Sequence, residues 1–175
     1  MKKLIIIAAV AAFSLPAFAQ KTDKLPEGTR AATGFTHQYT LTAADIRGLS
    51  GSTGTNLTNT IIAIGTNQAV EKIGWVIKTP MWSAAETNMN TNMTFSVGDA
   101  ASATKFTGVY HFGSNNIAGT GPQWAGTTNA SVTYLTSSNL NIYFGCLSGG
   151  SPAWSKVTNG QIRVFFRLVD YQGLR

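Results

Sequence analysis

The sequence predicts an all-β protein, a single antiparallel β-sandwich of jelly-roll-like form with about eight strands. Short segments alternate apolar and polar residues, and clusters of Gly, Asn, Ser and Pro separate them at intervals of roughly 10–20 residues. Only 11% of the 175 residues are charged, against about 25% in ordinary globular domains. Thr, Ser, Asn and Gly replace the missing charge, which favours strands and turns over surface helices.

Residues 1–19 have the three parts of a secretory signal peptide. Lys2 and Lys3 form the positive region, residues 4–13 form the apolar core, and Ala-Phe-Ala at 17–19 forms the cleavage site. The alternative is an uncleaved membrane anchor, but the apolar run is short for a bilayer. We therefore expect a secreted, extracellular or cell-surface protein that has no membrane contact after cleavage.

The segment after the signal peptide, residues 20–34, is polar and contains one Pro and two Gly. This composition predicts a flexible N-terminal arm. In a second interpretation, the arm adds as a strand to the open sheet edge of a neighbouring molecule. The sandwich domain is expected to span residues 35–175.

The first strand of that domain is predicted at residues 35–42, FTHQYTLT, because apolar or aromatic and polar residues alternate there. Residues 43–48 fit one helical turn that ends at a glycine. Residues 60–64, TIIAI, fit a short buried strand. The alternation places four side chains of the first strand on one face: Phe35, His37, Tyr39 and Leu41.

Residues 69–80 and 93–97 predict two further strands, joined by a loop rich in Asn and Thr. Trp75 and Ile77 fall on one face of the first of these strands. Pro80 is expected to end that strand, because proline has no amide hydrogen to donate.

The second half of the chain predicts a strand at 105–112 and then a long Gly-rich loop at 113–129. Residues 130–136 and 140–147 fit a hairpin, and 161–171 fit the last strand. We expect the aromatic residues of the strands to meet in one shared interior, namely Phe35, Tyr39, Trp75, Phe95 and Phe165.

No residue pattern indicates catalysis, so we expect a protein that is not an enzyme and has no catalytic residues. A hydrolase needs a nucleophile with a base, or two placed carboxylates. His37 and His111 sit inside predicted strands beside aromatic residues, which is typical of structural histidines. Asp99 is the only acid in its region, and no Cys/His cluster has zinc spacing. We therefore expect neither a metal nor a cofactor.

Three tryptophans are the candidate binding residues, because each is predicted to lie in a loop beside Pro, Gly or Ser. They are Trp82, Trp124 and Trp154. Exposed loop tryptophans stack on sugar rings or anchor protein interfaces. The alternative is that each tryptophan covers one end of the sandwich core.

The net charge of +6 is scattered along the chain, and no run of Lys and Arg forms a nucleic-acid footprint. We therefore expect no nucleic-acid partner. The single cysteine, Cys146, cannot form an internal disulfide. It lies in an apolar run, which predicts a buried thiol, and an intermolecular bridge is the alternative.

Three stretches together resemble small β-sandwich structural proteins of tailed-bacteriophage virions, such as tail-fibre, spike and head-decoration subunits. They are VIKTPMW, MTFSVGDAASATKF and GQIRVFFRLVDYQG. The resemblance implies a structural subunit with no catalytic residues to transfer. The signal peptide is not part of that pattern, so a secreted bacterial protein of similar fold stays open beside a virion protein.

Together these observations predict an exported, non-enzymatic structural or interaction module in an oligomeric or filamentous surface or virion-like assembly. Its partner would be itself, as a homo-oligomer, or another surface or virion protein. The alternative function is a secreted carbohydrate-binding module that holds a glycan with the loop tryptophans.

Overall fold

The computed structural model describes residues 22–49, 56–85, 87, 89–113, 123–146 and 153–171, with side chains for all of these except 56 and 123–131. The predicted signal peptide lies outside the described residues. No described helix is long and apolar enough to cross a membrane.

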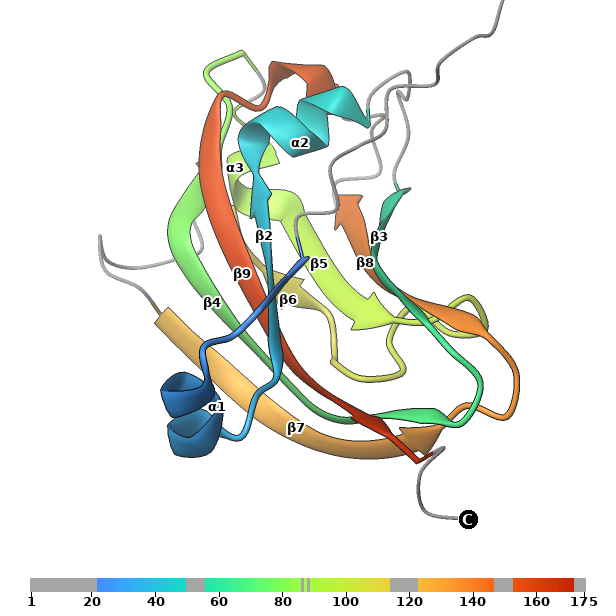
Figure 1. Ribbon diagram of the computed structural model, residues 1–175. Coiled ribbons are helices and arrows are strands. Elements are labelled where there is room, and N and C mark those ends of the chain that lie inside the picture. The colour runs from blue at the N-terminus through green and yellow to red at the C-terminus, as the bar shows by residue number, and fades with distance from the viewer. Residues whose placement is uncertain are drawn as a thin grey trace, which may run out of the picture.

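The described residues form nine strands in two antiparallel sheets, which confirms the predicted sandwich (Figure 1). The strands are β1 (Thr22–Lys24), β2 (His37–Thr42), β3 (Asn56–Ile64), β4 (Gln68–Trp82), β5 (Met93–Gly98), β6 (Tyr110–His111), β7 (Gln123–Thr133), β8 (Ser138–Cys146) and β9 (Asn159–Asp170). The helices are short: α1 (Glu27–Thr33), α2 (Ala43–Gly48), α3 (Met89–Asn92) and a 3-10 turn at Trp154–Lys156.

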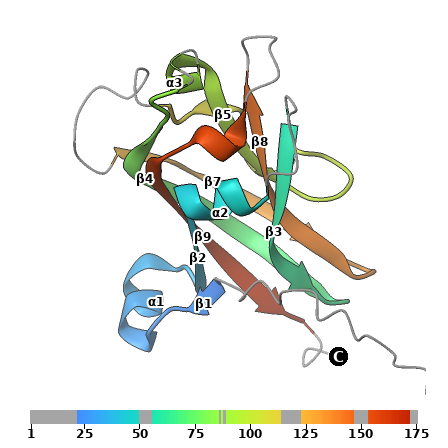
Figure 2. The ribbon, with the colours of Figure 1, turned by 90° about the horizontal axis from the view of Figure 1, so that it is seen from above.

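The strand order is that of a jelly roll with one added strand. One sheet has the order β1-β2-β9-β4-β7 and the other has the order β3-β8-β5-β6. Without β1, each sheet has four strands, and successive strands alternate between the sheets except at β5 and β6. This interleaving is the double-sheet arrangement of jelly rolls. Figure 2 shows the two layers from above, with α2 over one end of the sandwich.

The interior is a chain of aromatic rings that joins the two sheets. Trp75 of β4 meets Phe95 of β5 edge to face, with ring centroids 6.1 Å apart. Phe95 contacts Phe112, and Phe112 contacts Phe144 of β8 at 6.0 Å. Such pairs add roughly 0.5–1.5 kcal/mol each to the stabilisation from buried area. The predicted meeting of Tyr39, Trp75 and Phe95 in one core is confirmed.

Phe35 and Phe165 do not join this core, contrary to the prediction. Phe165 lies between Val164 and Phe166, which both point inward, so its ring points to the outer face of the five-stranded sheet. Phe35 precedes β2, so the alternation of that strand does not extend to it. Its ring packs on the outer face, 5.8 Å from the ring of Phe165.

The predicted hairpin of residues 130–136 and 140–147 is wrong. β7 pairs with β4 in one sheet, whereas β8 pairs with β3 and β5 in the other. The turn between them therefore carries the chain across the sandwich. The predicted loop at 113–129 is also too long, because β7 begins at Gln123.

Several predicted boundaries shift. α2 matches the predicted turn at 43–48, with a capping box between Thr42 and Asp45. β4 continues past Pro80 to Trp82, with register shifts on both sides of Thr79 that accommodate the missing amide hydrogen. The predicted strand at 105–112 is reduced to β6.

The segment expected to be a flexible arm has regular structure where it is described. β1 adds to the edge of β2, with Thr22 opposite Tyr39, and α1 follows it. The strand addition expected on a neighbour thus occurs on the chain's own sheet. Leu25, between β1 and α1, is buried.

Candidate binding site

The structure describes the side chains of two of the three candidate tryptophans, and their surroundings differ. Trp82 is the last residue of β4, and 44% of its surface is exposed. Trp154 begins the 3-10 turn and is fully buried against Phe144. The structure therefore contradicts a contact role for Trp154, which covers one end of the core instead. Trp124 lies in β7, and its side chain is outside the described residues.

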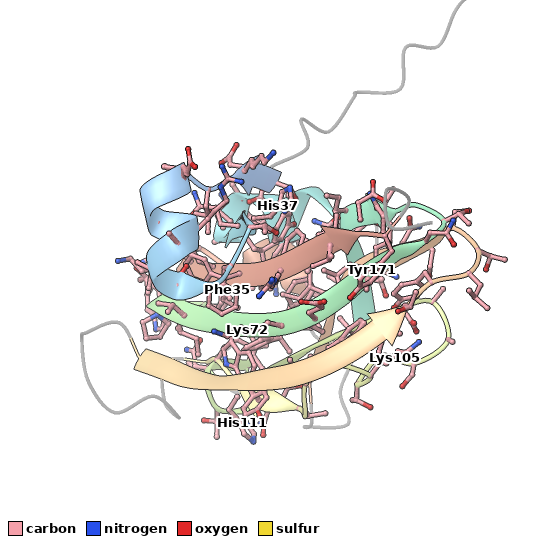
Figure 3. The ribbon with its side chains drawn as sticks, turned by 60° about the horizontal axis from the view of Figure 1, so that its bottom comes forward. Phe35, His37, Lys72, Lys105, His111 and Tyr171 are labelled. Carbon is pink, nitrogen blue, oxygen red and sulfur yellow. The ribbon has the colours of Figure 1, made fainter. Side chains whose placement is uncertain are left out.

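The two histidines lie on opposite sides of the molecule (Figure 3). The ring of His37 stacks on Phe166 at 5.2 Å, and its Nδ1 lies 2.8 Å from the hydroxyl of Thr36. Burial lowers the pKa of His37, and the cations Lys24 and Arg30 lower it further. A histidine base in a catalytic triad is instead oriented by a carboxylate. Across the described residues, no group of three or more His, Cys, Asp or Glu side chains could hold a metal ion.

The outer face of the four-stranded sheet carries rows of hydroxyl groups. In one row, Tyr143 of β8 lies between Thr58 of β3 and Ser96 of β5. In the next row, Gly145 of β8 lies beside Thr94 of β5. Thr94 and Ser96 are almost fully buried, at 3% and 5% exposure. Polar residues therefore cover this face at positions where they alternate with the apolar core residues.

The loop that follows β5, residues 99–109, folds back beside this face. Between the loop and the sheet is a cavity of about 460 Å³. We refer to it as the hydroxyl-lined cavity. The described residues that line it are uncharged and come from both the sheet and the loop. Among them are the hydroxyl residues Thr58, Thr94, Ser96, Thr104 and Tyr143, beside apolar residues such as Val109.

Asp99 holds the loop in place. Its carboxylate accepts hydrogen bonds from Tyr134 at 2.8 Å and from the amides of Ala101 and Ser102 at 3.0 Å, and it pairs with Lys105 at 2.5 Å. Burial raises the pKa of Asp99, but the bonds from Lys105, Tyr134 and the amides outweigh burial and lower it overall. The loop beside the cavity is thus fixed by a buried, ionised carboxylate.

The same network ties the loop to the sheet. The hydroxyl of Tyr143 donates to the backbone oxygen of Asp99 at 2.5 Å, and Asn141 donates to that hydroxyl at 3.2 Å. Tyr143 therefore lines the cavity with its ring while its hydroxyl anchors the loop.

The other sheet has a smaller cavity, of about 380 Å³, beside α1 on its outer face. Its lining includes Glu27 and Arg30 of α1, Phe35, and Arg167 of β9. Arg167 forms an ion pair with Glu71 at 3.1 Å. The charges in this cavity are thus of both signs and partly paired.

Sequence reasoning missed the hydroxyl-lined cavity. The signal was present in MTFSVG and IYFGC, where hydroxyl residues or glycine alternate with apolar residues. The alternation identifies an outward face, but only strand pairing brings Thr94, Ser96 and Tyr143 together. Asp99 stood out in the sequence only as an isolated acid unsuited to a calcium loop.

No protein-family model matches this sequence, and no curated protein matches it either. Among solved structures, one described as the cyanophage Pam1 capsid asymmetric unit is similar to it. The identity is 18%, the match covers 74% of this chain and 81% of that chain, and the TM-score is 0.44. A likeness at this level carries no functional argument, so the function is argued from the described residues.

Proposed function

We propose that this protein is an exported, non-enzymatic structural subunit that assembles with copies of itself or with another surface or virion protein. Jelly rolls occur in viral capsid proteins and in lectins, so the strand order agrees with this function by analogy of fold. The observation that carries the proposal is the long uncharged edge of the five-stranded sheet.

That edge is β7, which pairs only with β4 among the described residues. Its 11 residues, QWAGTTNASVT, include no charged residue and no proline. Soluble proteins usually protect long sheet edges with charges, prolines or very short strands, because an open edge can pair with another chain. The opposite edge strand of the same sheet, β1, has only 3 residues and carries Asp23 and Lys24.

The edges of the other sheet are less suited to pairing. β6 has only 2 residues. β3 has 9 residues, but its register shifts between Thr60 and Ile62. The hydroxyl of Thr22 also donates to the backbone oxygen of Ile61 at 2.5 Å. β7 is therefore the edge that we assign to assembly.

The test is the mass of the purified protein by size-exclusion chromatography with light scattering across a range of concentrations, with electron microscopy of the largest species. We expect particles heavier than the monomer, in a proportion that rises with concentration. A protein that stays monomeric at every concentration would overturn the proposal.

A charge variant locates the contact. Thr128→Lys places a cation in the middle of β7 and is expected to shift the population towards monomer. Thr136→Lys is the matched control, because Thr136 is exposed in the turn after β7. If both variants assembled equally strongly, the contact between subunits would not involve β7.

Export has a separate test. Intact mass spectrometry of the protein from the culture medium should give a chain that begins at Gln20. Recovery of the uncleaved chain from the cell membrane would contradict the proposed export.

A further inference from the structure

We propose that the hydroxyl-lined cavity is a binding site for a neutral saccharide. This inference does not depend on self-assembly, and it places glycan binding on the four-stranded sheet rather than on the loop tryptophans. Five features of the cavity support it: a glycine in its lining, its hydrogen-bonding groups, its apolar surface, the lack of charge in its described lining, and its fixed walls.

The lining includes one glycine in the middle of the sheet. Gly145 lies in β8, the second strand of the sheet, and it lines the cavity together with Tyr143, two residues before it, and Thr94 on β5. Its φ is not positive, so the strand does not need a glycine there for a special backbone conformation. The volume of about 460 Å³ falls within the usual range for small-ligand pockets.

The lining offers hydrogen bonds of the kind that sugars use. The hydroxyls of Thr58, Thr94, Ser96 and Thr104 can each donate and accept. Within the described residues, the hydroxyls of Thr94 and Ser96 take part in no hydrogen bond, although both residues are nearly buried. Neither hydroxyl oxygen is among the buried side-chain atoms that have no partner, so both are accessible from the cavity. A ligand with several hydroxyls could therefore bond to them.

Apolar surface in the cavity suits the carbon–hydrogen face of a sugar ring. Tyr143 presents an aromatic ring. Val109 on the loop is 54% exposed, which makes it one of the few large apolar side chains exposed among the described residues. Most of the accessible lining is apolar, with the hydroxyls set among apolar groups. Such a mixture is typical of small-ligand sites.

The charge balance selects a neutral ligand. β3, β5 and β8 contain no Asp, Glu, Lys or Arg, and the side chains that line the cavity are likewise uncharged. Among the described lining residues, a phosphate, sulfate or carboxylate group would find no cation to pair with, and charged groups are poorly stabilised without one. The Lys105 ammonium is already paired with Asp99.

The walls are held in position before any ligand arrives. Asp99 fixes the start of the 99–109 loop, and Tyr143 fixes it to the sheet. A site that is already formed loses little conformational entropy on binding. We therefore expect binding without a large change in the loop.

The experiment is titration of the isotope-labelled protein with neutral oligosaccharides, observed by amide chemical shifts. The probes are glucose, galactose and N-acetylglucosamine di- and trisaccharides, each up to about 10 mM, because weak single sites have dissociation constants near the millimolar range. We expect saturable shifts at residues 94–96, 104–109 and 143–145. No saturable shift with any of these probes, or shifts confined to other surfaces, would overturn the proposal.

Variants test the site without relying on one substitution. Gly145→Val adds a side chain to the lining of the cavity and is expected to weaken binding at least tenfold with an unchanged melting temperature. Thr94→Val removes one hydroxyl at nearly constant volume and should weaken binding about fivefold, as expected for one hydrogen bond. Thr133→Val, at an exposed position of β7, is the matched control and should bind like the parent. Equal affinity in all three variants would overturn the proposal, and this result would leave the assembly test untouched.

Discussion

The outer face of the five-stranded sheet carries charges and aromatic rings, whereas the outer face of the four-stranded sheet carries hydroxyls. β4 and β9 hold Glu71, Lys72, Lys78, Arg163, Arg167 and Asp170, while β3, β5 and β8 hold no charged residue. Both sheets share one apolar interior. The two faces therefore differ in chemistry although the alternation that produces them is the same.

A glycine in each sheet shows how differently the two faces are covered. On the first face, the ring of Phe35 sits directly over Gly74, so that a Cβ at this position would lie 2.8 Å from the ring. Lys72 lies 4.5 Å above the same ring and donates to the backbone oxygen of Thr33 in α1 (Figure 3). On the second face, Gly145 is part of the lining of the hydroxyl-lined cavity. One glycine accommodates a packed ring, and the other lines a cavity.

The largest effect is expected from Asp99, which holds the 99–109 loop beside the outer face of the four-stranded sheet. Asp99→Asn removes the charge that Lys105, Tyr134 and two amides stabilise. We expect it to lower the free energy of unfolding by about 2–4 kcal/mol, because buried partners are left poorly satisfied. Denaturant unfolding measures the change. Lys105→Met is the companion variant and should have a smaller effect, since Lys105 is partly exposed. A loss below that of Lys105→Met would contradict this role of Asp99.

The next effect contrasts the two glycines directly. Gly74→Val forces the ring of Phe35 to move and is expected to destabilise the protein by about 1–3 kcal/mol, as overpacking does. Gly145→Val should change stability by less than about 0.5 kcal/mol, because valine suits an extended strand and Gly145 lines a cavity rather than a packed ring. Thermal melts of the two variants give the comparison. If the two variants lost the same amount of stability, the two outer faces would be equally well packed at these glycines.

A smaller effect concerns pH and the same carboxylate. The pKa of Asp99 lies below its ordinary value of 3.8 in the folded protein, so the unfolded chain binds a proton more readily. The stabilisation is therefore complete above that value and is lost as the pH falls through the lowered pKa. Unfolding free energies measured between pH 5 and pH 2 should fall more steeply for the parent than for Asp99→Asn. Parallel curves would show that Asp99 is not responsible.

The smallest effect is on the charged face. The Arg167–Glu71 ion pair is exposed, with half of the Arg167 side chain accessible. Glu71→Gln should therefore lower stability by only about 0–1 kcal/mol, and added salt should reduce the difference. A loss that is larger and independent of salt would mean that Glu71 acts chiefly through its 2.6 Å bond with Tyr171.

Local patterns predicted much of the fold. The alternation in residues 35–42 and 93–97 located β2 and β5, and the helical turn predicted at residues 43–48 coincides with α2. The same patterns failed where a residue lies just outside a strand, as for Phe35, or where a turn joins two different sheets, as between β7 and β8. A turn signal in the sequence predicts that the chain reverses direction, but it does not predict which strand the next segment pairs with.

Local sequence patterns were also insufficient to predict the candidate site. The position of a tryptophan beside Gly and Pro suggested exposure, but packing against Phe144 buries Trp154. The hydroxyl-lined cavity combines residues from three strands and a loop, so no short stretch of sequence could show it.

The sequence by itself determined the class of fold, because a period of two and a shortage of charge leave few arrangements other than packed sheets. It also determined which strands are charged, since that is a property of each strand alone. Only the tertiary structure decided that Gly145 faces a cavity while Gly74 faces a ring. That choice depends on which loop or helix folds over each sheet, and contacts between distant residues fix it.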